Sequence, residues 1–151
     1  MKNMICLLKQ QDYNTWIAFA KEVEPLFGPM ADSEEFRDGI TKCIQNNNAF
    51  GIYNDEGILA GIIALDRDHN EILWLAVGKK FRGNKFGDKL VKKAIEELEV
   101  NGDIYVQTFS RKTEEGKYAR IIYENNGFVD LRDAGINPAN IETVIMVKRK
   151  I

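Results

Sequence analysis

The sequence is short of the residues that build metal centres and cross-links. Its 151 residues include only two cysteines, one histidine and three prolines. Cys6 and Cys43 form no CxxC motif, so we expect reduced thiols in a cytoplasmic protein. A Ser-His-Asp triad or a histidine zinc site would depend wholly on His69. The sequence therefore disfavours both kinds of site, and no bound metal is expected.

Long apolar runs are also missing. No run approaches the roughly 18–20 residues that span a bilayer, so no membrane partner is expected. The apolar stretch within the first twelve residues, MKNMICLLKQQD, is too short for a secretory signal. The composition, 44% hydrophobic and 29% charged, is that of a soluble globular protein. The length predicts a single domain over residues 1–151 with a sizeable core.

Hydrophobic periodicity and turn residues predict the element order β-α-α-β-β-β-α-β-α-β-β. Three antiparallel strands and then a strand–helix–strand crossover indicate an α/β fold (an α+β mixed sheet) with helices flanking the central sheet. There is no run of βαβ units and no GxGxxG after the first strand, which excludes a dinucleotide fold. The sequence also has no GxxxxGK[ST] phosphate loop. The expected helices span about 12–23, 32–45, 85–99 and 113–124, and the strands are 4–9, 49–53, 58–65, 71–77, 103–109, 128–131 and 141–148.

Residues 71–98 carry the clearest functional signal. An apolar strand leads into a loop rich in glycine and basic residues, which runs into a helical pattern. Backbone N–H groups at a helix N-terminus lack intrahelical partners, and the helix dipole favours negative charge there. Residues 79–93 hold seven cations and one anion in a chain of net charge −2, which indicates a local anionic ligand. At Gly83 and Gly87, side chains would block access to the backbone; the alternative is an ordinary solvated basic face.

Three stretches of this sequence resemble the GNAT superfamily of N-acetyltransferases. The loop RGNKFG at 82–87 is similar to the family's [RQ]-x-x-G-x-[GA] acyl-CoA pyrophosphate loop, and the strand EILWLAV precedes it. The stretch ARIIYENNGF at 119–128 is similar to A-x-x-x-Y-x-x-x-G-F. Element order and length also agree, so the resemblance covers nearly the whole chain. It implies a GNAT-like fold, acetyl-CoA as cosubstrate, and a homodimer, the common assembly in this family.

The resemblance also implies how the cosubstrate is held. The pantetheine arm would enter between two splayed central strands, whose freed N–H groups at Leu75 and Val77 would stabilise an oxyanion. The pyrophosphate would lie over the backbone of residues 83–87. The residues expected to bind acetyl-CoA are Leu75, Ala76, Val77, Arg82, Gly83, Asn84, Lys85, Phe86, Gly87 and Asp88.

Two residues depart from the family pattern. Lys85 stands where the pyrophosphate loop keeps its central glycine. Its side chain can point outward if the backbone there is already helical, and acyl-CoA binding would then survive. Gly116 stands where the family often has an asparagine, seven residues ahead of the tyrosine. Thr108 or Ser110 would then take over what that asparagine holds.

Acetyl transfer to an amine needs a base, because a free alkyl amine with a pKa of about 10.4 is mostly protonated at pH 7. The resemblance places a carboxylate at the head of the central strand, where Glu71 stands; a solvated acid is the alternative reading. The leaving thiolate, whose thiol pKa is about 8.5, needs an acid. Tyr123 matches the family's tyrosine, the alternative being a packed tyrosine with its hydroxyl in water. Strand alternation predicts that one face of this strand carries Glu71, Leu73, Leu75 and Val77. The other face would carry Ile72, Trp74 and Ala76.

The acceptor is the least defined part. In the family the loop between the first two helices covers it, and Phe27, Met30 and Trp74 are expected to line an apolar part of its pocket. Nearby carboxylates would attract a cationic amine, unless they are only a solvated helix face. These are Glu22, Glu24, Asp32, Glu34, Glu35 and Asp38.

The sequence thus favours acetyl transfer from acetyl-CoA to a primary amine of a small molecule or a peptide. A non-catalytic acyl-CoA-binding or sensor domain of the same fold stays open, because Lys85 and Gly116 depart from the family pattern. Nucleic-acid binding is disfavoured by the net acidity of the chain.

Overall fold

The computed structural model describes residues 4–150, except for the side chain of residue 115. Its elements follow the expected order, and none of its helices is long and apolar enough to cross a membrane. The thiols of Cys6 and Cys43 are free. The strands are β1 (Met4–Leu7), β2 (Ala49–Tyr53), β3 (Leu59–Asp66), β4 (Glu71–Val77), β5 (Ile104–Phe109), β6 (Val129–Ile136) and β7 (Glu142–Lys148), and the helices are α1 (Tyr13–Phe27), α2 (Glu34–Gln45), α3 (Phe86–Leu98) and α4 (Lys117–Asn125).

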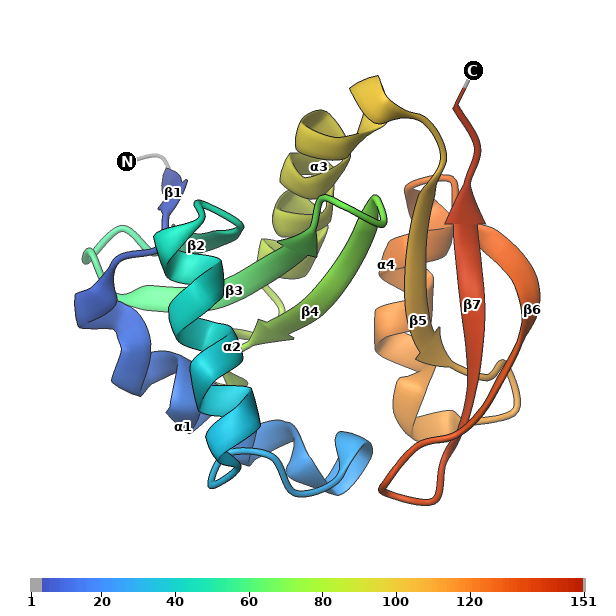
Figure 1. The fold of residues 1–151 in the computed structure, drawn as a ribbon, viewed down its shortest axis with the longest axis horizontal. Coiled ribbons are helices and arrows are strands. Elements are labelled where there is room, and N and C mark those ends of the chain that lie inside the picture. Colours follow the sequence, from blue (N-terminus) through green and yellow to red (C-terminus); the bar gives the residue numbers. More distant parts are fainter. Residues whose placement is uncertain (1–3, 151) are drawn as a thin grey trace.

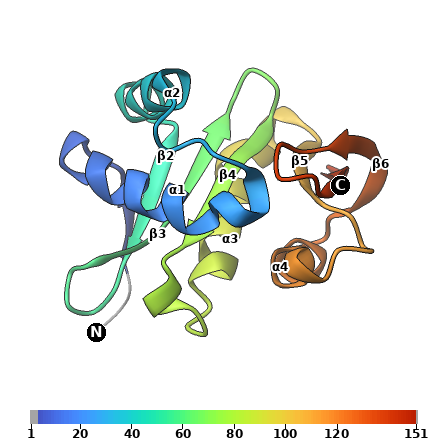
Figure 2. The same ribbon diagram turned by 90° about the horizontal axis from the view of Figure 1, so that it is seen from below.

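The strands form one mixed sheet in the order β1-β2-β3-β4-β5-β7-β6, in which only the β4–β5 pair is parallel. Helices α1 and α2 lie on one face, and α3 and α4 lie on the other (Figures 1 and 2). Each face buries its own apolar cluster, the first around Trp16, Ile40 and Ile62 and the second around Leu90 and Leu98. The expected mixed sheet with helices on both faces is therefore confirmed.

Strand β4 does not alternate regularly. Its register against β3 shifts so that Trp74 faces Ala64 while Ile72 faces Leu65, which leaves Leu73 as an extra, bulged residue. A bulge places two residues opposite one and reverses the alternation beyond it. Ile72 therefore packs in the same cluster as Val77, and the prediction that it shares a face with Trp74 is wrong.

Strands β4 and β5 stay paired only at their first residues, where Glu71 faces Tyr105 and Ile72 faces Val106. The bulge at Leu73 follows directly, and from there the two strands diverge (Figure 1). A bulge bends and twists its strand, which accounts for the separation at this point. The sheet thus opens at its centre, in the gap between β4 and β5.

Several element boundaries differ from the predictions. Strand β1 ends at Leu7 and not at residue 9, and α4 begins at Lys117 and not at residue 113. Helix α1 continues through Pro25 to Phe27, because a proline in the last turn removes only one backbone bond and the helix ends at Gly28 with φ 97°. Helix α2 is capped by Ser33, whose side chain accepts from the N–H of Phe36, and not by Asp32. Strand β6 runs on to Ile136, since its pairing with β7 absorbs register shifts at two bulges.

Candidate active site

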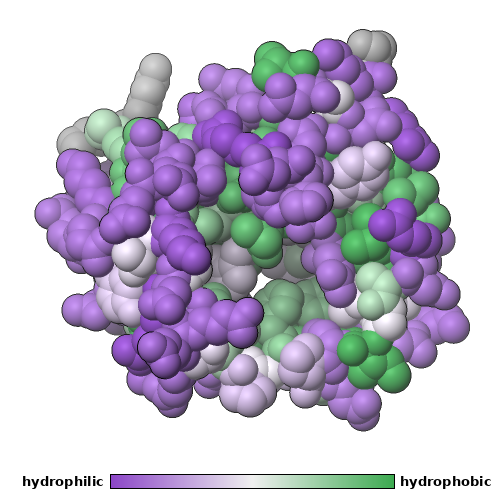
Figure 3. All heavy atoms as spheres, in the orientation of Figure 1, coloured by the Kyte–Doolittle hydropathy of each residue, from purple (hydrophilic) through white to green (hydrophobic). Residues whose placement is uncertain are grey.

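The gap between β4 and β5 is hollow. A larger chamber of about 310 Å³ and a smaller chamber of about 120 Å³ adjoin there and share Phe27, Leu75, Phe109 and Ala119. The rings of Phe27 and Phe109 lie 5.1 Å apart, between the two chambers. Figure 3 shows the surface hollowed near the centre of the molecule, where apolar side chains are visible. The smaller chamber reaches Arg82 and Gly87 at the start of α3, and the larger chamber reaches Tyr123 and Trp74.

Two loops close the open end of this gap. The side-chain N–H of Asn137, between β6 and β7, donates to the carbonyl of Leu26 at 2.8 Å. A Cβ on Gly28 would come within 2.6 Å of Pro138, so the loop after α1 touches the β6–β7 loop closely. The gap is therefore bounded by strands on two sides and by these two loops at its end.

The start of α3 presents backbone donors that no side chain caps. Lys85 precedes the helix and offers no side-chain acceptor to its first N–H groups. Those groups have no intrahelical partners and carry the positive end of the helix dipole. Gly83, with φ 88° and open space around its Cα, leaves the loop backbone accessible. This geometry suits a bound pyrophosphate.

Lys85 adopts the left-handed conformation, with φ 62° and ψ 22°. The backbone at Lys85 is therefore not helical, and the condition under which its side chain would point outward is not met. Glycine is favoured at positive φ because it has no Cβ, which gives the physical reason for a glycine at this place in the family. The left-handed conformation therefore costs Lys85 backbone strain.

Other residues of the loop are held by neighbours. A Cβ on Gly87 would come within 2.8 Å of Ile122, so this glycine lets α3 approach α4. The Asp88 carboxylate accepts from Lys92 Nζ at 2.7 Å and from Asn126 Nδ2 at 2.8 Å, and these bonds, chiefly that from Lys92, lower its pKa. What Asp88 offers a ligand is its backbone N–H. Asn84 donates its side-chain N–H to the carbonyl of Phe81 at 3.0 Å, inside the loop.

Strand β4 directs two amide groups into the gap. The N–H of Gly78 donates to the carbonyl of Ala60 in β3 at 2.8 Å. Backbone groups of successive residues in a strand point to opposite sides, so the N–H groups of Val77 and Leu75 point away from β3. Because β5 has already diverged, these donors face the chambers and not a neighbouring strand. They suit the stabilisation of a developing oxyanion.

Tyr123 lies in the wall of the larger chamber. Its side chain is 4% exposed, comes from α4 and packs edge-on against Phe128 with ring centroids 5.6 Å apart. Burial raises the pKa of its hydroxyl, so the phenol is protonated at neutral pH. A protonated hydroxyl in the wall of this chamber can donate a proton there.

Glu71 lies at the closed end of the gap, where β4 and β5 still pair. Burial, and next the charge of Asp66, raise the pKa of its carboxyl against the opposing effect of His69. Among the described residues, Glu71 is not one of those that line either chamber. The structure thus places the two expected catalytic residues in different surroundings, Tyr123 in the chamber wall and Glu71 beyond it.

Arg120, which the sequence analysis did not single out, holds the far side of the gap. Its buried guanidinium donates to the carbonyl of Phe109 at 3.1 Å and pairs with Glu124 at 3.0 Å and Asp130 at 2.9 Å. The N–H of Ser110 bonds to β7, so the Phe109 carbonyl points towards the gap. Arg120 therefore satisfies a carbonyl that lost its strand partner, and its spacing of four from Glu124 was the available signal.

The space beside Gly116 is filled by Phe109. A Cβ on Gly116 would overlap the Cβ and ring of Phe109. Of the two residues expected to replace the family's asparagine, Thr108 lines the larger chamber, and the hydroxyl of Ser110 accepts from the N–H of Lys112 at 3.2 Å.

The expected substrate residues Phe27, Met30 and Trp74 all line the larger chamber. The nearby carboxylates do not: none is found among its described lining residues. Glu24 accepts from the N–H groups of Met30 and Ala31, and these bonds, first that from Met30, lower its pKa. Glu22 accepts from the N–H of Lys79 at 3.0 Å, and Asp32 pairs with Arg37. Within residues 4–150, no group of three metal-ligating side chains is found.

Comparison with known proteins agrees with this geometry. Residues 9–150 match the family described as acetyltransferase (GNAT) domain. The fold is similar to an acetyltransferase of the GNAT family from Bacillus cereus (TM-score 0.76, 12% identity, 100% of this chain and 99% of that chain). It is also similar to a chimeric spermidine N-acetyltransferase from Vibrio cholerae (0.75, 17%, 99% and 96%). A third similar structure is the PaiA N-acetyltransferase from Thermoplasma acidophilum in complex with coenzyme A (0.72, 19%, 99% and 99%). No curated protein matches the chain in sequence.

Proposed function

Because the chain belongs to the GNAT family of acetyltransferases, we propose that it transfers the acetyl group of acetyl-CoA to a primary amine. The observation that carries this proposal is the pair of N–H groups of Leu75 and Val77. They face a gap that runs from the first turn of α3 to the buried hydroxyl of Tyr123. One set of donors, one proton source and one anion site thus meet along a single cleft.

The residues present fit acetyl-CoA. The uncapped first turn of α3 and the guanidinium of Arg82 supply positive charge and N–H donors for a pyrophosphate. The smaller chamber beside Leu75, Ala76 and Val77 is narrow and apolar, as a pantetheine arm requires. The thioester would then reach the junction of the two chambers, near Phe27 and Phe109.

In the proposed reaction, an amine nitrogen attacks the thioester carbonyl carbon from the larger chamber. The N–H groups of Leu75 and Val77 hold the negative charge that grows on the carbonyl oxygen, and one such donor is worth about 3 kcal/mol of barrier. The C–N bond forms and the C–S bond breaks, and the Tyr123 hydroxyl gives its proton to the departing sulfur. The products are an N-acetyl amide and free CoA thiol.

The amine must lose protons as it reacts. Glu71 is the proposed base, because the pKa of its carboxyl is raised and so lies nearer to neutral pH than the pKa of an ordinary glutamate. Since Glu71 lies outside both chambers, we propose that the proton reaches it through water from the larger chamber. Tyr123 and Glu71 then act at opposite ends of one path.

A non-catalytic acyl-CoA sensor is the second candidate, favoured by the strained Lys85 in the pyrophosphate loop. The two functions separate in one experiment that measures acetyl-CoA binding by calorimetry and thiol release from acetyl-CoA with a panel of primary amines. Binding together with amine-dependent thiol release supports the enzyme. Binding without release for any amine supports the sensor. The predicted homodimer and cytoplasmic location remain parts of this proposal.

A further inference from the structure

A groove continues the larger chamber between α2 and β4. Its volume is about 380 Å³, and it shares Phe36, Leu73 and Trp74 with that chamber. The other lining residues are Trp16, Ser33, Glu35, Gly39, Ile40, Cys43 and Ala64. We call this space the α2–β4 groove. A molecule that reacts in the larger chamber can therefore extend into it.

Gly39 keeps the groove open. It lies inside α2, where glycine costs about 1 kcal/mol relative to alanine. The usual reasons for a glycine do not apply, because its φ is not positive and a Cβ there would meet nothing within 4 Å. The position faces the groove, so any larger side chain would reduce the space available to a ligand.

The opposite wall of the groove is aromatic and apolar. Trp74 packs between Trp16, at 5.6 Å, and Phe36, at 6.4 Å between ring centroids. The bulge in β4 presents Leu73 beside them with 51% of its surface exposed. An exposed leucine next to two indole rings is an unfavourable surface for water and a favourable one for an apolar ligand.

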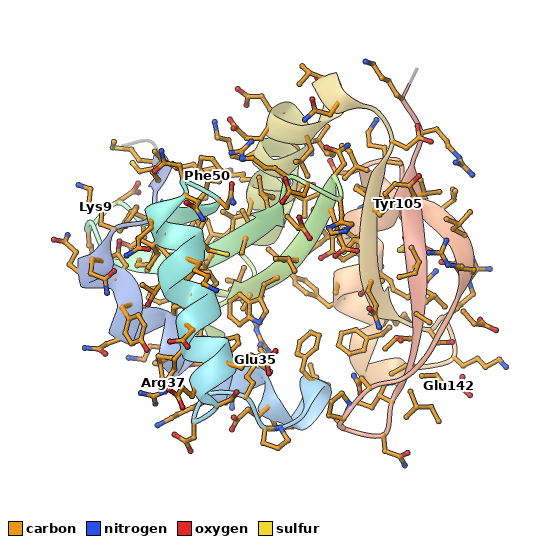
Figure 4. All side chains as sticks on the ribbon, viewed as in Figure 1. Lys9, Glu35, Arg37, Phe50, Tyr105 and Glu142 are labelled. Carbon is orange, nitrogen blue, oxygen red and sulfur yellow. The ribbon has the colours of Figure 1, made fainter. Side chains whose placement is uncertain are left out.

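Few charged side chains line the larger chamber and the α2–β4 groove. The one carboxylate among the described lining residues of the groove is Glu35, and the larger chamber has none. Glu35 lies in the exposed first turn of α2, on the side that faces the central opening, whereas Arg37 lies on the other side (Figure 4). A second ammonium group deeper in the groove would lose its hydration without gaining a partner.

We propose that the α2–β4 groove holds the apolar body of the acceptor. The substrate class is then a small monoamine with an aromatic or bulky apolar body and no second charge, unlike a polyamine. The reaction itself is taken from the proposed function, on which this inference rests. The class of acceptor is inferred from the groove. The reactive amine lies in the larger chamber, and the body packs against Trp74 and Leu73.

The test compares Gly39→Leu, which fills the groove, with Asp38→Leu on an adjacent exposed position of the same helix. Leucine favours a helix more than glycine, so the first variant should fold. We expect Gly39→Leu to raise KM for phenethylamine at least tenfold while leaving the kinetics with ethylamine and the affinity for acetyl-CoA unchanged. Asp38→Leu should change none of these. Equal effects of Gly39→Leu on both amines would overturn the proposal.

Spermidine tests the alternative acceptor class, a polyamine with a second ammonium group. Preference for spermidine over phenethylamine, reduced by Glu35→Gln, would also overturn the proposal, because it would place a second ammonium beside Glu35. Under our proposal phenethylamine stays the better substrate than spermidine in both the wild type and Glu35→Gln.

A binding measurement separates this inference from the proposed function. Both tryptophans of the chain, Trp16 and Trp74, line the groove, so their fluorescence reports its occupancy. We expect saturable quenching by phenethylamine in the wild type that is weakened at least tenfold in Gly39→Leu. Quenching without acetyl transfer would refute the proposed function and keep the groove assignment. If acetyl transfer occurs but Gly39→Leu does not weaken the quenching, the groove assignment would be refuted and the proposed function kept.

Discussion

Gly116 and Phe109 are packed so closely that a Cβ on Gly116 would overlap the phenylalanine side chain. The ring of Phe109 in turn packs at a tilt against that of Phe27 at the junction of the two chambers, and the Phe109 carbonyl accepts a hydrogen bond from Arg120. The glycine at this place thus allows an aromatic ring to form part of the cleft wall. We expect substitutions at these contacts to have measurable effects on stability.

Gly116→Ala should destabilise the protein by about 2 kcal/mol, because overpacking a filled site typically costs 1–3 kcal/mol. Urea unfolding measures the loss. In the Phe109→Ala background the same substitution should cost much less, since the overlapping ring has been removed. Equal costs in both backgrounds would show that the ring is not the obstacle.

Lys85 should respond to substitution according to backbone conformation. Lys85→Val should destabilise the protein by about 1–2 kcal/mol, because a β-branched residue tolerates the left-handed region poorly. Lys85→Gly should be neutral or slightly stabilising and should retain acetyl-CoA binding. Thermal unfolding and calorimetry on the two variants test this. If Lys85→Gly lost more stability than Lys85→Val, the left-handed conformation at this residue would be refuted.

Tyr123→Phe should lower kcat at least tenfold with little change in acetyl-CoA affinity, because it removes a proton donor and keeps the buried ring. The control is Tyr13→Phe, on a tyrosine of α1 that is not among the described residues lining either chamber, which should leave kcat unchanged. Steady-state kinetics and calorimetry supply the two readouts. Unchanged turnover in Tyr123→Phe would remove its assigned role.

Glu71→Gln should depress activity most near neutral pH and less at high pH, where free amine is plentiful. Whereas activity falls, the stability of the folded Glu71→Gln variant should rise relative to wild type at neutral pH. Because the pKa of Glu71 is raised in the folded protein, its ionisation opposes folding, and stability is lost as pH rises through the folded pKa.

The variant should therefore gain stability relative to wild type above that pKa and show no relative gain below the unfolded value. Urea unfolding at pH 4 and pH 7 checks this, with His69→Gln as a control for the neighbouring turn. An activity loss that is independent of pH would indicate a structural role for Glu71.

Much of the fold was predictable because local patterns control it. Alternating and apolar runs located the strands, and Glu71–Val77 was predicted with its observed bounds. The predictions that were wrong depend on contacts between distant segments. The bulge at Leu73 arises from pairing with β3, and a single strand pattern contains no sign of it.

The sequence by itself identified the family and predicted an anion site and a catalytic tyrosine, because these depend on residue types at short spacings within one loop and one helix. Only the tertiary structure decided how they are used. The bulge opens β4 from β5, Arg120 satisfies the carbonyl that this leaves unpaired, and Phe109 fills the space beside Gly116. Only the tertiary structure likewise forms the α2–β4 groove, because its shape depends on packing between residues that are far apart in the chain.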